Sequence, residues 1–205
     1  MLPTVYLAAE DAPGLAVGRK LVSEQPILSV YNNGGENARG FSNLRKKTPN
    51  FDQMGAKGFP VLMLTDLDGD PCPSGKIADW LGSVPSRGFL FRLCVREVEA
   101  WLLADRAAMA AFLRIKEDKL PTAPERLPDP KAVLIKLAQA APRKIRVGLT
   151  PIGQAAIGPD YNELLSGFIA DSWSIDRAAA RAPSLKRARK RVGELAVLVD
   201  SEATA

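Results

Sequence analysis

The sequence contains no histidine among its 205 residues. This absence excludes Ser-His-Asp and Cys-His catalysis and any histidine-ligated zinc site, and it leaves carboxylates, lysines and hydroxyls as the chemical repertoire. The two cysteines, Cys72 and Cys94, are too few for a disulfide framework and do not form a CxxC pair, so we expect neither a disulfide staple nor a zinc knuckle. Any catalysis is therefore expected to depend on carboxylate and metal chemistry.

Long apolar runs and nucleotide-binding motifs are also missing. No run approaches the roughly 20 apolar residues that span a bilayer, and the first residues do not combine a basic stretch with a long apolar core. No Walker A sequence and no GxGxxG motif follows a candidate strand. We therefore expect a cytoplasmic protein without membrane contact that does not bind ATP or a dinucleotide by itself.

The composition is that of an ordinary globular domain, with 46% hydrophobic and 25% charged residues. A chain of this length can bury one substantial core, alone or with a small appendage. The net charge of +5 is a modest bias toward anionic partners. We expect the chain to fold by itself around one main core.

Apolar segments rich in β-forming residues predict four strands, at residues 4–9, 27–31, 59–65 and 89–95. The segment 59–65 is apolar throughout, which is typical of a central parallel strand. Segments with helical spacing alternate with the strands, at residues 15–22, 74–81 and 97–113. This alternation predicts an α/β fold with a mostly parallel sheet flanked by helices.

The composition shifts after residue 115, where several prolines precede a series of segments with helical spacing. These segments lie at residues 131–140, 161–170, 175–181 and 184–199. Earlier in the chain, residues 32–58 are rich in Asn, Gly and basic residues, and we interpret them as a mobile excursion with one short helix at 51–54. We predict an α/β core at residues 1–115 and a helical C-terminal extension at 116–205 that packs on the core.

Acidic residues follow three of the predicted strands. Glu10 follows the first strand, Asp66 and Asp68 follow the third, and Glu99 lies just after the fourth. Ligands bind outside the carboxyl ends of strands in parallel α/β sheets, so acids at these positions favour a functional site. The ordinary alternative is that such acids cap helices and solvate turns.

The chemistry of these acids suits a hard divalent cation, since Mg²⁺ binds oxygen ligands from carboxylates, waters and phosphates. Residues two apart in an extended segment point the same way, so we expect Asp66 and Asp68 to face one ion. We predict that Glu10, Asp66, Asp68 and Asp70 hold Mg²⁺, with Mn²⁺ as an alternative ion. An EF-hand does not fit, because the sixth loop position is Pro71 instead of Gly.

Two strings of residues resemble a known family. LTDLDGDPCP at 64–73 and REVEAWLLAD at 96–105 are similar to a bacterial uncharacterised family of stand-alone Toprim-like proteins, related to the Toprim domain of overcoming-lysogenization-defect nucleases. The resemblance implies that Glu10 is the Toprim glutamate, that Asp66 and Asp68 are the DxD pair, and that Glu99 is an additional acid. Relatives often follow the first glutamate with Gly and a further acid, whereas Asp-Ala-Pro-Gly occupies 11–14 here.

The resemblance, together with the acids, predicts a Mg²⁺-dependent phosphoryl-transfer protein that hydrolyses nucleic-acid phosphodiesters. Its catalytic residues would be Glu10, Asp66, Asp68 and Glu99. By resemblance alone, we also expect a role in phage defence beside a separate ATPase subunit. The alternative is a non-catalytic regulatory module that binds a metal or a partner and works with a separate ATPase.

Basic residues cluster in two segments of the sequence, Arg45-Lys46-Lys47 and a C-terminal group that includes Lys186, Arg187 and Lys190. Such clustering suits contacts with phosphates, so we predict nucleic-acid binding at these residues. The alternative is a solvated helix face, because apolar residues at helical spacing accompany the C-terminal group.

Overall fold

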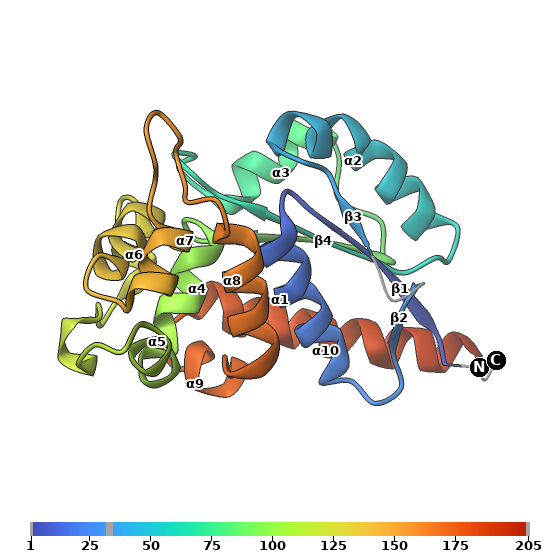
Figure 1. Ribbon diagram of the computed structural model, residues 1–205. Helices are drawn as coiled ribbons and strands as arrows, with labels where there is room; N and C mark the ends of the chain where they lie inside the picture. The colour runs from blue at the N-terminus through green and yellow to red at the C-terminus, as the bar shows by residue number, and fades with distance from the viewer. Residues whose placement is uncertain (1, 32–34, 204–205) are drawn as a thin grey trace. The chain divides into compact units, whose positions relative to one another are not determined.

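The structure is a computed structural model that describes residues 2–31 and 35–203 (Figure 1). Its strands are β1 (Thr4–Ala9), β2 (Ser29–Val30), β3 (Glu36–Asn37), β4 (Val61–Asp66) and β5 (Phe89–Cys94). Its α-helices are α1 (Ala12–Ser23), α2 (Phe41–Ala56), α3 (Pro73–Leu81), α4 (Val98–Ala104), α5 (Arg106–Leu113), α6 (Pro130–Ala138), α7 (Arg143–Leu149), α8 (Tyr161–Asp171), α9 (Ile175–Ala179) and α10 (Pro183–Ala203). Two short 3-10 helices are η2 (Glu117–Lys119) and η3 (Pro124–Arg126). The predicted α/β class is confirmed.

The chain divides into two compact units. The first unit comprises Met1–Leu93 and Arg187–Ala205, and the second comprises Cys94–Lys186. The division that we predicted at residue 115 stays a prediction, and the boundaries of these units differ from it. The proline-rich residues after 115 form the turns η2 and η3 within the second unit, and most of α10 belongs to the first unit.

The sheet of the first unit has the strand order β2-β1-β4-β5, and β3 also pairs with β1. β1 pairs in parallel with β2, β3 and β4, and Ala9 lies opposite Leu64 in the β1–β4 register. Helices α1 and α10 cover one face of the sheet, and α2 and α3 cover the other (Figure 1). Because both faces are covered, β1 and β4 are apolar along their length and do not alternate with polar residues.

Our interpretation of residues 32–58 as an excursion is wrong for the described part, whereas residues 32–34 lie outside the described residues. Helix α2 extends over Phe41–Ala56, far beyond the short helix that we predicted. Its buried residues, Leu44, Thr48, Phe51 and Gly55, recur at spacings of three and four, which gives α2 one packed face despite its polar composition. Similarly, the strand predicted at 27–31 is reduced to β2.

The second unit is helical, and the single helix that we predicted over 97–113 is two helices, α4 and α5. The break is at Asp105, whose side chain is fully buried. Asp105 accepts hydrogen bonds from the Ser174 backbone N–H at 2.8 Å and from Nε and Nη2 of Arg177, both at 2.8 Å. These tertiary contacts override the high helix propensity of the Ala- and Leu-rich segment.

Trp101 is a buried residue of α4, and its indole N–H donates to the Ser184 hydroxyl at 2.6 Å. Trp173 in turn donates to the Trp101 carbonyl at 3.1 Å, so the two buried indoles are both hydrogen-bonded. Along the described residues, no helix is long and apolar enough to cross a membrane.

Asp105→Asn tests the structural role of this break. The substitution replaces a carboxylate that accepts from three residues, Ala108, Ser174 and Arg177, with an amide that is a poorer acceptor, so we expect a loss of about 2–3 kcal/mol in unfolding free energy. Urea unfolding measures this loss. The control is Asp171→Asn at the exposed end of α8, which should change stability by about 0.5 kcal/mol or less. Equal effects of the two substitutions would contradict the assigned role.

Candidate functional site

Two acidic residues lie at the carboxyl ends of adjacent strands in the first unit. Glu10 directly follows β1, and Asp66 is the last residue of β4. Glu10 Oε1 accepts hydrogen bonds from the Asp66 backbone N–H, at 3.1 Å, and from the Thr65 hydroxyl. The parallel register of β1 and β4 therefore brings Glu10 beside Asp66 at one edge of the sheet.

The Glu10 carboxyl has a pKa above its ordinary value. Burial raises this pKa most, and the negative charge of Asp68 raises it further. The hydrogen bonds from Thr65 and Asp66 and the positive charge of Lys76 act in the opposite direction. Since the net direction is upward, Glu10 holds a proton more strongly than an exposed glutamate does.

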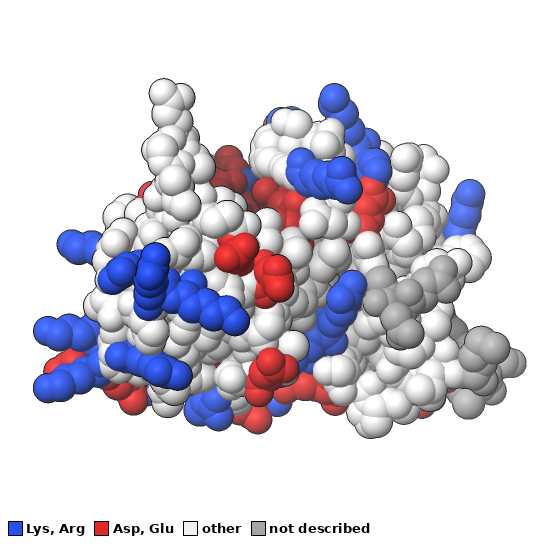
Figure 2. All heavy atoms as spheres, in the orientation of Figure 1, with Lys and Arg blue, Asp and Glu red and all other residues white. Residues whose placement is uncertain are grey.

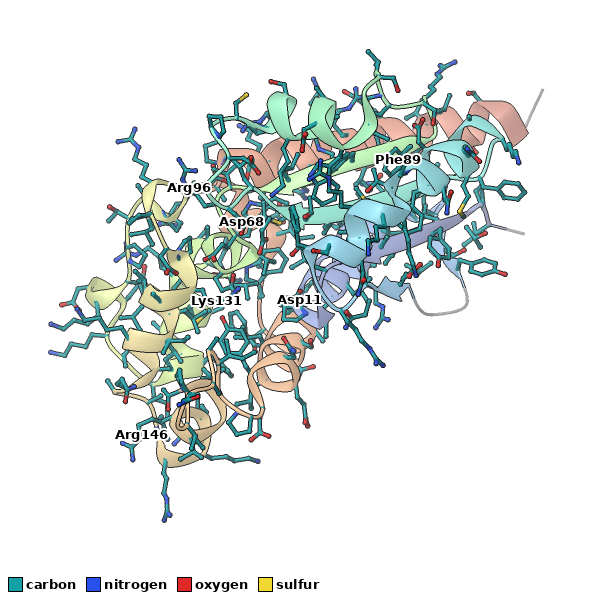
Figure 3. The ribbon with its side chains drawn as sticks, turned by 90° about the horizontal axis from the view of Figure 1, so that it is seen from above. Asp11, Asp68, Phe89, Arg96, Lys131 and Arg146 are labelled. Atoms are coloured by element: carbon teal, nitrogen blue, oxygen red, sulfur yellow. The ribbon has the colours of Figure 1, made fainter. Side chains whose placement is uncertain are left out.

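The loop after β4 carries Asp68 and Asp70, and Figure 3 labels Asp68 there and Asp11 at the start of α1. This loop is not extended as we predicted. Asp68 has a left-handed backbone with a φ of 52°, and the Asp70 N–H donates to the Leu67 carbonyl at 3.1 Å. The chain turns immediately after Asp66, so the two-residue alternation of an extended strand does not apply to Asp66 and Asp68.

Lys76 on α3 supplies a positive charge to this loop, and its side chain is only 1% exposed. Its Nζ donates to the Asp66 carbonyl at 2.6 Å and to the Leu67 carbonyl at 3.3 Å. The same Nζ lies 3.2 Å from Asp68 Oδ2 and 3.1 Å from Asp70 Oδ2. A buried ammonium thus ties the two exposed carboxylates to the end of β4.

Our sequence reasoning missed Lys76. Its ammonium lies 5.0 Å from the ring centre of Phe41 and 5.6 Å from that of Trp80, which cover the lysine stem with aromatic surface. Lys76 and Trp80 are four residues apart on α3, and both are buried. The available signal was therefore a lysine that shares the apolar face of the helix next to the acidic loop.

The donor chemistry of this edge suits Mg²⁺, which needs only one or two protein carboxylates in addition to waters and phosphates. Glu10 supplies one such carboxylate, held beside the Thr65 hydroxyl and the backbone N–H of Asp66. Within residues 2–31 and 35–203, no group of three or more acidic or cysteine side chains is arranged to hold a metal ion. The four predicted ligands are therefore not assembled as one group, and Asp68 and Asp70 instead share the Lys76 ammonium.

Glu99 belongs to the second unit, where its side chain is completely buried. Its Oε1 accepts a hydrogen bond from the Tyr161 hydroxyl at 2.7 Å and lies 3.6 Å from Lys131 Nζ. Its Oε2 is buried without a hydrogen-bond partner in the described part of the chain. Burial raises the pKa of Glu99 to about 7, although Lys131 and Tyr161 both lower it. Glu99 is therefore an unusual acid that titrates near neutral pH.

The basic residues predicted on α2 are partly engaged with acids. Arg45 Nη2 lies 2.9 Å from Asp79 Oδ2, and Lys47 pairs with Glu36. Lys46 is exposed. On the face drawn in Figure 2, basic side chains gather over α2 with acidic side chains next to them. The α2 patch is therefore a mixed surface with a positive excess.

The basic residues predicted at the C-terminus lie on α10. Lys186 and Arg187 have exposed side chains, and Lys190 Nζ lies 3.7 Å from Glu194 Oε1. Arg187 belongs to the first unit, in which α10 also carries Arg191. The exposed side of this helix is therefore strongly positive along its first half.

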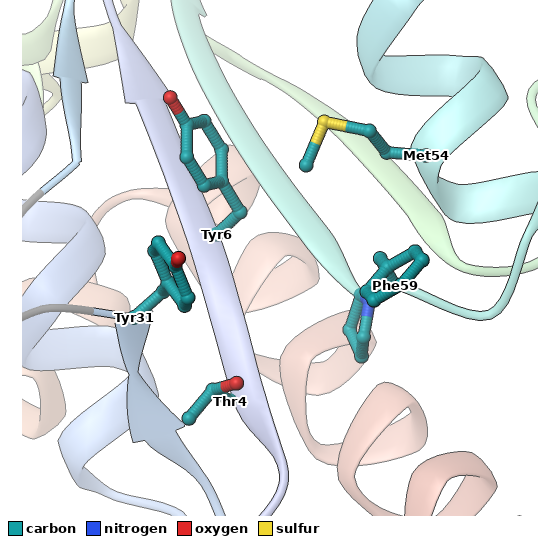
Figure 4. Close-up of a pocket in the computed structure, with 6 residues that line it drawn as sticks. Thr4, Tyr6, Tyr31, Met54 and Phe59 are labelled. Carbon is teal, nitrogen blue, oxygen red and sulfur yellow. The ribbon is translucent and has the colours of Figure 1, made fainter.

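A cavity of about 450 Å³ opens in the first unit at the other end of β1. Its lining is apolar and aromatic, with Tyr6 and Tyr31 on one side and Met54 and Phe59 on the other (Figure 4). Tyr6 precedes Glu10 by four residues, which corresponds to about 13 Å along a strand. The cavity is therefore separate from the acidic edge and carries none of its carboxylates.

Comparison with known proteins gives no relative, since no protein-family model, no curated protein and no solved structure matches the chain. The function is therefore argued from the geometry of the site. The resemblance of residues 64–73 and 96–105 supports a proposed function and not a family assignment.

Glu99→Gln tests the environment of the buried acid. The pKa of Glu99 is about 7 in the folded chain against 4.5 ordinarily, so the folded state binds the proton more strongly. Stability should therefore fall as pH rises from about 4.5 to 7 and then level off. Glutamine cannot ionise, so the variant should lose this decline and exceed the wild type at pH 8 by roughly 3 kcal/mol.

The measurement is urea unfolding at a series of pH values between 4.5 and 8. Glu163→Gln, an exposed position on α8, is the matched control and should follow the wild-type curve. A wild-type curve that coincides with the Glu99→Gln curve at every pH would show that Glu99 does not titrate in this range.

Proposed function

We propose that this chain is a Mg²⁺-dependent phosphoryl-transfer protein that hydrolyses nucleic-acid phosphodiesters. The observation that supports the proposal best is the hydrogen bond between Glu10 Oε1 and the Asp66 backbone N–H, at 3.1 Å. It fixes the Glu10 carboxylate against the main chain of Asp66 at the carboxyl edge of a parallel sheet, where such sheets bind ligands. The resemblance of residues 64–73 and 96–105 to stand-alone Toprim-like proteins supports the same class.

In this proposal Glu10 and Asp66 hold the ion, and a bound Mg²⁺ would stabilise negative charge on the phosphate and lower the pKa of an attacking water. Glu10 is also the candidate general base, because its carboxylate lies at the carboxyl edge of the sheet where the ion would be held. The Thr65 hydroxyl and the Asp66 N–H orient its carboxylate. No histidine competes for the role.

Lys76 has a positioning role in the proposed site. Its hydrogen bonds to the Asp66 and Leu67 carbonyls stabilise the turn that follows β4. Its contacts with Asp68 and Asp70 hold these carboxylates at the same edge of the sheet, where they raise the local negative charge available to a cation. The side chain is too buried to contact a substrate itself.

The partner chemistry follows from charge and from the resemblance. The positive excess on α2 suits a nucleic-acid backbone. The resemblance adds a role in phage defence beside a separate ATPase subunit, and the absence of a nucleotide-binding motif in this sequence agrees with a division of labour between two chains. Both extensions are part of the proposal.

Nuclease assays on the wild type, Asp66→Asn and Glu10→Gln test the proposed activity. The wild type should nick single- or double-stranded DNA or RNA with Mg²⁺ or Mn²⁺, and EDTA should abolish the reaction. Each substitution removes a ligand charge with little change of volume, so we expect a loss of about 100-fold or more in rate. Asp79→Asn, an acid that is 61% exposed on α3, should retain wild-type activity. Activity that survives EDTA and both substitutions would reject the metal mechanism.

A second candidate function is a non-catalytic module that binds a metal or a partner. The observation that favours it is the Lys76 ammonium, which already lies between Asp68 and Asp70 as a permanent counter-ion. The ammonium offsets one of the two carboxylate charges, so the loop carries its own counter-ion. The acids would then serve the fold of the loop, and a partner surface would carry the function.

Lys76→Met separates the two candidates. The variant keeps the length of the side chain but loses the ammonium, so without divalent ions we expect a loss of about 1–3 kcal/mol in unfolding free energy. If the acids can hold Mg²⁺, a Mg²⁺ titration should raise the melting temperature of this variant more than that of the wild type. Lys57→Met, at an exposed position, is the matched control. If the melting temperature of Lys76→Met does not change with Mg²⁺, the result would favour the second candidate, a non-catalytic module that binds no metal.

A further inference from the structure

A cluster of arginines lies in the first unit, where α10 runs along the sheet beside β5 (Figure 1). On β5, Leu90 and Arg92 are two residues apart and so face the same side of the sheet. On α10, Arg187 and Arg191 are four residues apart and share one side of the helix. Leu90 and Arg191 line the same cavity, so these two surfaces meet.

The strand residue of this cluster, Arg92, has an unsatisfied donor. Its guanidinium is half-buried, and its Nε is buried without a hydrogen-bond partner among the described residues. Burial lowers the pKa of Arg92, and the positive charges of Arg191 and Arg187 lower it further. A half-buried cation beside two like charges is unfavourable for folding unless an anion compensates it.

The acidic residue that faces the cluster is Glu194. Its carboxylate contacts the Arg191 guanidinium and lies 3.7 Å from Lys190 Nζ. Its negative charge raises the pKa of Arg92, but by less than burial and the two arginines lower it. The Glu194 carboxylate therefore compensates only part of the positive charge of three guanidinium groups and the Lys190 ammonium. This positive excess predicts that an anion binds here.

Space for such an anion exists beside Arg191, the member of the cluster that lines a cavity together with Arg87. A cavity of about 220 Å³ is lined by Arg87, Leu90, Arg191, Glu194, Leu195 and Leu198. This volume is several times the roughly 30 Å³ that a water molecule occupies in the liquid. Guanidinium groups present N–H donors in a planar fork that matches two oxygens of a phosphate, which a single ammonium cannot do.

We propose that Arg92, Arg187 and Arg191 form a binding site for a phosphoryl group. Inorganic phosphate and the backbone of a nucleic acid share this chemistry, and the experiment distinguishes the two sources. The site stands apart from the proposed phosphodiester hydrolysis, because neither Glu10 nor Asp66 takes part in it.

The test uses the full chain and two probes, sodium phosphate and a fluorescent single-stranded oligonucleotide, both at constant ionic strength. We expect saturable binding by the wild type, seen as a rise in melting temperature with phosphate or as a rise in anisotropy with the oligonucleotide. Arg92→Gln and Arg191→Gln should each weaken binding at least about tenfold, since each removes one guanidinium charge from the proposed site. Without ligand, Arg92→Gln should melt at or above the wild-type temperature, because it removes a buried unpaired charge.

Arg19→Gln, an exposed position on α1 in the same unit, is the matched control and should bind as the wild type does. Binding of phosphate alone would assign the free ion as the ligand. Binding of the oligonucleotide alone would assign the nucleic-acid backbone. In that case the slope of log affinity against log salt concentration should become less steep by about one for each substituted arginine. Absence of binding to both probes, or an equal loss in Arg19→Gln, would overturn the proposal. Both probes are measured without divalent ions, so binding at these arginines does not depend on the proposed metal site and the two proposals fail independently.

Discussion

Strand β1 has parallel neighbours on both sides and helices over both of its faces, and this burial constrains the whole first unit. A strand in that position must be apolar along its length, so a charged residue can follow it only where the strand ends. The register that sets Ala9 opposite Leu64 then places the Glu10 carboxylate beside Thr65 and the backbone N–H of Asp66. The acidic edge is therefore a direct consequence of how β1 is buried.

Much of this could be predicted from the sequence, because buried strands leave an unbroken apolar signal. The segments that became β1, β4 and β5 were predicted within one or two residues. The predictions failed where contacts between residues far apart in the sequence determine the local structure. Asp105 breaks an Ala- and Leu-rich helix because Ser174 and Arg177, far along the chain, bind its carboxylate. The polar composition of α2 hid four buried positions, and the role of Lys76 depended on a turn that no local pattern specifies.

Lys76, which is buried, and Arg92, which is half-buried, differ in what surrounds them. Lys76 is satisfied by two carbonyl oxygens and two carboxylates, so the chain alone balances its charge. The pKa of Arg92 is lowered by burial and by the positive charges of Arg191 and Arg187, and its Nε has no hydrogen-bond partner among the described residues. A cation that is paired within the chain stabilises a loop. A cation without an anionic partner is instead stabilised when an external anion binds to it. The same residue class thus serves structure at one place and recognition at the other.

The first unit is discontinuous, since Arg187–Ala205 rejoins it after the whole second unit has intervened. On a ribosome, Met1–Leu93 would emerge long before the segment of α10 that carries Val192 and Leu195, both buried in the finished protein. The face of the sheet that α10 covers would stay open to water or to a chaperone during that interval. Docking of α10 closes contacts of very long sequence separation, so this step is expected to come late and slowly in folding.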